Sequence, residues 1–135
     1  MVILVTDDMD DIRELMKLLL ESQGHEVDTA ANGQEAIRAA TQRVPDVILM
    51  DLCMPIMDGF EATRALRLMP TTCRVPIIAV SAYVGDKEWC DKAIAAGCDE
   101  CVGKPVDLDT LDDALRRFGS IPSQPRRVDP SLQPA

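Results

Sequence analysis

Aromatic residues and positive charges are scarce in this sequence of 135 residues. Aromatic side chains make up 3% of the chain and hydrophobic residues 47%, so the core has to be built from aliphatic side chains. The net charge of −9 argues against direct binding to nucleic acid, because phosphates would be repelled. No apolar run approaches the roughly 20 residues that a membrane span requires, and the first residues lack the basic leader of a signal peptide. We therefore expect a cytoplasmic protein that does not bind membranes.

Cysteine motifs for metals or disulfides are also sparse. Five cysteines, an odd number without a secretory signal, indicate free thiols in a reducing compartment. Cys98 and Cys101 form one C-x-x-C, but the chain has no second C-x-x-C or H-x-x-H to complete a zinc site. A redox C-x-x-C normally opens a helix, whereas these residues flank a turn that enters a predicted strand. The spacing therefore does not favour a zinc or redox role.

Four apolar segments of strand length each end in a polar group. The segments are residues 2–6, 47–50, 77–80 and 102–103, and the groups that follow them are Asp7-Asp8, Asp51, Ser81 and Lys104. The carboxyl ends of parallel strands lie on one edge of an open sheet, so we expect these groups to converge. Carboxylates, a hydroxyl and an ammonium group together have the chemistry to bind a metal ion and a phosphoryl group.

Strand and helix patterns alternate five times along residues 1–119. A weaker strand is predicted at 27–30 and a short fifth strand at 101–102, and apolar residues recur at helical spacing between the strands. Such alternation predicts an α/β domain with a doubly wound parallel sheet and helices on both faces. Residues 120–135 contain four prolines and no periodicity, so we expect a disordered tail or a linker.

Asp7 and Asp8 have two interpretations, since acidic residues also favour the N-terminal end of a helix. Asp51 directly follows an apolar run, where a lone buried carboxylate is costly. Three carboxylates at one edge would repel one another, and a divalent cation relieves that repulsion. Ligands that are all oxygen favour Mg²⁺, which keeps room for a phosphate oxygen.

Asp51 then has the setting of a carboxylate that attacks phosphorus and becomes an aspartyl phosphate. Lys104 is either a surface lysine or a cation that neutralises the phosphoryl oxygens, and Pro105 favours the second interpretation because it restrains the local backbone. Ser81 is either an ordinary residue at a strand end or a donor to a phosphoryl oxygen.

These segments together resemble the CheY-like receiver domain of two-component response regulators. The resemblance spans residues 2 to about 118 and is carried by residues 6–8, 50–59, 80–82 and 103–105. It implies a flavodoxin-like (βα)5 fold with five strands in the order 2-1-3-4-5. It also implies that Asp51 is the phosphoacceptor, Ser81 the switch hydroxyl and Lys104 the partner of the phosphoryl group. The implied Mg²⁺ ligands are Asp7, Asp8, Asp51 and the backbone carbonyl of Cys53.

By the same resemblance, the chain is a signalling switch and not an enzyme acting on other molecules, beyond its own phosphorylation and dephosphorylation. A histidine kinase or histidine phosphotransfer protein would supply the phosphoryl group, and a protein target would respond. Residues 57–67 and 85–90 look more like receivers of hybrid histidine kinases and their stand-alone relatives than like DNA-binding regulators. A receiver portion of a larger hybrid kinase or phosphorelay protein is thus the alternative. The family usually has Tyr or Phe three residues before the lysine, where this chain has Cys101.

Two other classes of protein share parts of this pattern. Phosphatases resembling haloacid dehalogenases carry a second aspartate two residues after the nucleophile, where this chain has Cys53 and so lacks the general acid. A flavodoxin-like electron carrier needs a phosphate-binding loop after its first strand and aromatic walls for the flavin. The acidic pair Asp7-Asp8 would repel that phosphate, and the aromatic residues are too few.

Overall fold

The computed structural model describes residues 1–52, 57–81, 87–103 and 108–119, and strands alternate with helices throughout. The elements are β1 (Val2–Thr6), α1 (Asp10–Ser22), β2 (Glu26–Ala30), α2 (Gly33–Gln42), β3 (Val47–Asp51), α3 (Gly59–Leu68), β4 (Ile77–Ser81), α4 (Lys87–Ala96), β5 (Glu100–Gly103) and α5 (Leu108–Gly119). Strands β2 and β5 each begin one residue earlier than predicted. The extra residues, Glu26 and Glu100, pair through their backbones with Val2 and Ile78.

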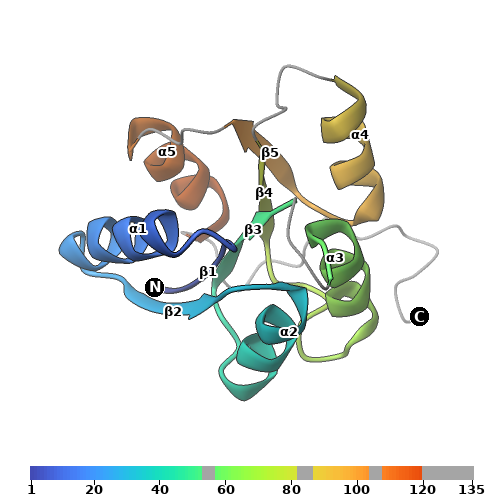
Figure 1. Ribbon diagram of the computed structural model, residues 1–135, viewed down its shortest axis with the longest axis horizontal. Helices are drawn as coiled ribbons and strands as arrows, with labels where there is room; N and C mark the ends of the chain where they lie inside the picture. Colours follow the sequence, from blue (N-terminus) through green and yellow to red (C-terminus); the bar gives the residue numbers. More distant parts are fainter. Residues whose placement is uncertain (53–56, 82–86, 104–107, 120–135) are drawn as a thin grey trace.

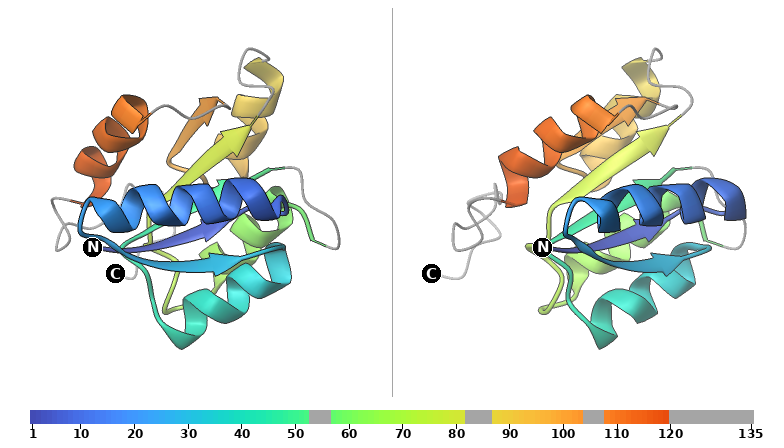
Figure 2. Two further views of the ribbon diagram at one scale, coloured as in Figure 1. Left: turned by 60° about the vertical axis from the view of Figure 1, so that its left-hand side comes forward. Right: turned by 90° about the vertical axis from the view of Figure 1, so that its left-hand side faces the viewer.

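The five strands form one parallel sheet in the order β2-β1-β3-β4-β5, which confirms the predicted doubly wound fold (Figure 1). All strand arrows point the same way, so their carboxyl ends lie along one edge (Figure 2). The chain starts in β1 near the middle of the sheet, moves outward to β2, and then crosses back to β3. That reversal places the topological switch point between β1 and β3, where open α/β sheets bind ligands.

Two helical layers cover the sheet, and each has its own apolar cluster (Figure 1). Alternate residues of β1 divide between them: Leu4 faces the cluster under α2, α3 and α4, whereas Ile3 and Val5 face the cluster under α1 and α5. The buried side chains are mostly Val, Ile, Leu, Ala and Met, as the shortage of aromatic residues predicted. Phe60 is a buried aromatic residue in the cluster under α2, α3 and α4.

Helix ends follow the sequence signals. Asn32 and Asp58 are the N-caps of α2 and α3, and their side chains accept hydrogen bonds from the amides of the residues three positions on. Gly24 and Gly97 follow α1 and α4 with φ of 93° and 122°, a left-handed backbone that glycine adopts without strain. Both helices therefore end within two residues of a glycine in this conformation.

None of the described helices has the length and apolar character needed to cross a membrane. Helix α5 ends at Gly119. The predicted tail at 120–135 lies outside the described residues, so the division of the chain at this point stays a prediction.

Candidate functional site

The strand register brings the predicted acidic residues together at the switch point. Thr6 of β1 pairs with Met50 of β3, and each is followed directly by an aspartate, Asp7 and Asp51. In the next pair of strands, Asp51 pairs with Val80, so the following residue, Ser81, ends β4 at the same edge. Parallel pairing thus brings three strand ends to one edge of the sheet.

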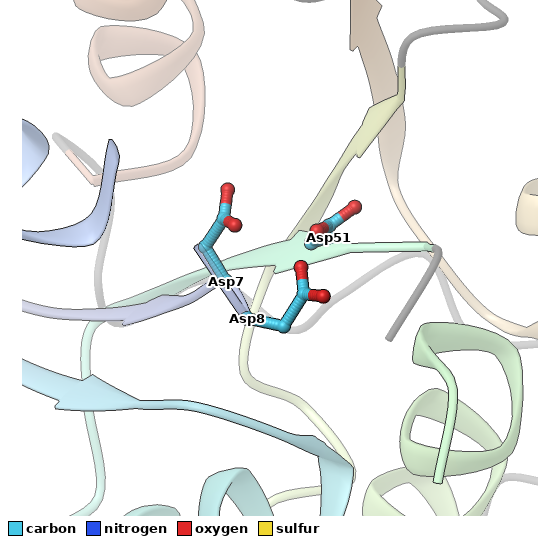
Figure 3. Close-up of side chains that lie close together, drawn as sticks. All are labelled: Asp7, Asp8 and Asp51. Atoms are coloured by element: carbon cyan, nitrogen blue, oxygen red, sulfur yellow. The ribbon is translucent and has the colours of Figure 1, made fainter. Parts of the chain in front are cut away.

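Three carboxylates meet at this edge. Oxygen atoms of Asp7, Asp8 and Asp51 all lie within 4.8 Å of one another, and the three side chains gather beside the end of β3 (Figure 3). Asp7 and Asp51 are buried, with 5% and 4% of their surfaces exposed, whereas Asp8 is exposed. The site is therefore open to solvent on the side of Asp8 and closed at its base. Among the described residues, this is the one group of three or more possible metal ligands.

Backbone contacts hold Asp7 in place. Its amide donates to the carbonyl oxygen of Ala30 at 3.1 Å, which extends the pairing of β1 with β2 by one residue. Its carboxylate accepts from the Met9 amide at 2.9 Å, and its carbonyl oxygen accepts from the Arg13 guanidinium at 2.8 Å. The N-cap of α1 is Met9. Neither Asp7 nor Asp8 therefore occupies the helix-capping position that the first interpretation of these acids requires.

Gly59 is a site residue that the sequence signals did not identify. It begins α3, and its amide donates to the carbonyl oxygen of Leu52 at 3.3 Å. A Cβ atom on Gly59 would lie 2.3 Å from the carbonyl oxygen of Asp51, closer than any real contact. Only glycine therefore permits α3 to start this close to the end of β3. The sequence signal was Asp58-Gly59 after an acidic strand end, which indicates a turn but not the close approach.

Ser81 is 2% exposed and ends β4, and Gly103 of β5 is its partner in the register. Lys104 follows Gly103 in the chain, and Cys53 follows Leu52. Lys104 and Cys53 lie outside the described residues, so their predicted roles stay predictions.

The donor set fits a hard divalent cation. Three carboxylates within 4.8 Å concentrate negative charge, and two of them are buried, where an uncompensated charge is costly. Carboxylate oxygens, with one side open for water, are the ligands Mg²⁺ prefers. Asp7, Asp8 and Asp51 are thus the residues that would hold the ion.

The sequence model of the response regulator receiver domain matches residues 3–116. The chain belongs to the response regulator receiver domain family. Its fold is similar to that of the receiver domain of sensor histidine kinase PA1611 from Pseudomonas aeruginosa. The two superpose with a TM-score of 0.80 at 34% identity, over 88% of this chain and 97% of that one. That structure holds a magnesium ion coordinated in its active-site cleft.

Curated relatives of this receiver domain differ in length. Protein PilH of Pseudomonas aeruginosa is 38% identical over 111 residues, which are 81% of this chain and 89% of PilH. Regulatory protein AtoC of Escherichia coli is 35% identical over 126 residues, which are 93% of this chain but 27% of AtoC. The receiver domain thus spans nearly all of one relative and about a quarter of the other.

The two cysteines of the C-x-x-C have different surroundings in this receiver domain. The Cys98 thiol lies 3.6 Å from the Thr63 hydroxyl, and burial raises its pKa to about 11. The Cys101 thiol instead contacts the thiol of Cys90, with 2.9 Å between the sulfur atoms. Cys101 therefore contacts Cys90 of α4 and not Cys98, its partner in the C-x-x-C motif.

Proposed function

We propose that this receiver domain is a signalling switch that accepts a phosphoryl group on Asp51 in a Mg²⁺-dependent reaction. The observation that carries the proposal is the buried Asp51 at the switch point, with Asp7 and Asp8 within 4.8 Å. Asp51 is then both the nucleophile and, together with Asp7 and Asp8, a ligand of the proposed metal ion.

In the proposed reaction, an Asp51 carboxylate oxygen attacks the phosphorus of a phosphorylated donor. A new O–P bond forms, the bond from phosphorus to the donor breaks, and the electron pair leaves with the donor group. Bound Mg²⁺ supplies positive charge that neutralises phosphoryl oxygens. The Ser81 hydroxyl donates a hydrogen bond to one phosphoryl oxygen, and Lys104 offsets the charge of another.

Histidine kinases or histidine phosphotransfer proteins are the proposed donors, and a protein partner is the proposed target. Membership of the receiver family supports this assignment, as does the kinase-linked receiver PA1611. We propose a cytoplasmic protein without direct nucleic-acid binding, in keeping with the net charge of −9. We propose that the domain catalyses its own phosphorylation and dephosphorylation and no reaction on other molecules.

The alternative is that the domain works as part of a larger hybrid kinase or phosphorelay protein. The partial coverage of relatives such as AtoC keeps this alternative open. The chemistry at Asp51 is the same in both cases, and only the connection to an output differs.

Intact mass after incubation with acetyl phosphate tests the proposal. We expect one added phosphoryl group with Mg²⁺ and little with chelator, and none on Asp51→Asn. Asp46→Asn is a matched control, because Asp46 precedes the other end of β3 and its carboxylate accepts a hydrogen bond from the Val2 amide that an asparagine oxygen can also accept. Addition to Asp51→Asn at the wild-type rate would contradict the assignment.

A further inference from the structure

Two thiols from different elements lie against each other beside the sheet. Cys90 is in the fourth position of α4, and Cys101 is in β5, eleven residues later. Their sulfur atoms are 2.9 Å apart. A disulfide bond requires about 2.0 Å between sulfur atoms, so the thiols would have to approach by roughly 0.9 Å, which is within reach of side-chain rotation.

The other two described cysteines have different neighbours. Cys98 is buried against Thr63, and the Cys73 thiol lies 3.6 Å from the carbonyl oxygen of Pro70. Cys90 and Cys101 are half-buried, as is Cys73, so a small oxidant reaches these three thiols more readily than it reaches the buried Cys98. The fold therefore pairs Cys101 with Cys90, and not with Cys98, its partner in the C-x-x-C motif.

We propose that Cys90 and Cys101 are a redox modification site, which forms a reversible intramolecular disulfide by exchange with a low-molecular-weight disulfide such as oxidised glutathione. One protein thiolate attacks a glutathione sulfur, the glutathione S–S bond breaks, and one glutathione thiolate leaves. The second protein thiol then loses its proton to solvent and attacks the mixed disulfide, which releases the second glutathione. Two protein thiols are oxidised and one disulfide is reduced, so atoms and electrons balance.

The order of the two attacks follows from the surroundings of Cys101. Burial, followed by the neighbouring Cys90 thiol, raises the pKa of Cys101 to about 12, so this thiol is protonated at neutral pH. Cys90 is then the first nucleophile, and Cys101 resolves the mixed disulfide. The dithiol persists in a reducing compartment and oxidises when the glutathione pool becomes oxidised.

Disulfide mapping of the whole chain tests the proposal. The reduced protein is equilibrated with defined mixtures of reduced and oxidised glutathione, acidified, alkylated, and cleaved before aspartate. This cleavage separates the three nearby cysteines, because Cys90, Cys98 and Cys101 fall in peptides 86–90, 91–98 and 99–106. We expect oxidising mixtures to link 86–90 with 99–106, to leave Cys98 alkylated, and to lose the link when reduced glutathione is restored.

Matched variants and an unfolded control sharpen the test. Cys90→Ser and Cys101→Ser should each abolish the link, and Cys73→Ser should retain it. In concentrated urea the linked fraction at the same glutathione ratio should fall on the order of tenfold or more, because the unfolded chain must close this loop itself. Mixed glutathione disulfides alone, a link through Cys98 or Cys53, or equal linking in folded and unfolded protein would overturn the proposal.

Discussion

Replacing Asp8 with asparagine should stabilise the metal-free protein and weaken its response to Mg²⁺. Two unit charges 4.8 Å apart repel by about 0.9 kcal/mol in water and by about 3.5 kcal/mol at an effective dielectric constant of about 20. Asp8 is exposed, so the lower figure applies to its repulsion by each of the other two carboxylates, about 2 kcal/mol in total. The Asp8 carboxylate also precedes α1, and a negative charge there stabilises the helix by about 0.3–1 kcal/mol, which the substitution removes. The net expectation is a gain of about 1 kcal/mol.

Urea denaturation followed by circular dichroism measures this effect, once with chelator and once with Mg²⁺. Ligand at a hundred times its Kd stabilises a folded protein by about 2.7 kcal/mol, and wild type should gain an amount of this order at such a concentration. The Asp8→Asn variant should gain much less at the same Mg²⁺ concentration. Wild type should therefore be the less stable protein in chelator and the more stable one in Mg²⁺.

Asp11→Asn is the matched control for this prediction. Asp11 is also an exposed acid near the start of α1, in its first turn, but it is not part of the carboxylate group. Its replacement should cost about 0.3–1 kcal/mol in both conditions, because only the interaction with the helix is lost. If Asp8→Asn behaves like Asp11→Asn in chelator and keeps the wild-type gain in Mg²⁺, Asp8 acts only on the helix and the reasoning is refuted.

Three further changes test other parts of the molecule. Gly59→Ala places a Cβ 2.3 Å from a backbone carbonyl oxygen of β3 and should lower the free energy of unfolding by about 1–3 kcal/mol in urea melts. Gly24→Ala should cost less, about 1 kcal/mol, because its Cβ meets open space and only the left-handed backbone is strained. Tyrosine at Cys101, combined with Cys90→Ala to make room, should enlarge the amide NMR shifts that beryllofluoride causes along α5, whereas equal shifts in wild type would show that coupling needs no aromatic ring. Truncation after Gly119 should leave the melting temperature and phosphorylation unchanged, and a large fall would mean that the tail docks on the domain.

The fold was predictable because most of its strands are apolar segments that end at charged or polar residues. All five residues of β3 and of β4 are buried, and such strands read as continuous hydrophobic segments. The edge strand β2 was harder to recognise, since buried and exposed residues mix along it. The starts of β2 and β5 were missed by one residue because Glu26 and Glu100 pair through their backbones, which side-chain polarity does not report.

The carboxylate group was predictable for a related reason. Strand ends share one edge of a parallel sheet, so Asp7 and Asp51 could be placed together from chain order and strand length alone. The approach of Gly59 to the end of β3 and the hydrogen bond from Arg13 to the Asp7 carbonyl were not predictable in this way. Both depend on where a helix begins relative to a strand, which the register of the sheet does not determine.

The contact between Cys90 and Cys101 depends on the rotation of one helix. Successive residues of an α-helix project about 100° apart, so Trp89 and Cys90 point in different directions from α4. Trp89 packs against Phe60 of α3, with 5.5 Å between the ring centroids, and the next side chain, Cys90, contacts Cys101 of β5. Position 101 is thus occupied by a thiol that contacts a second thiol. Because the thiols of Cys90 and Cys101 face each other, an aromatic side chain introduced at position 101 alone would have to displace the Cys90 thiol before it could pack.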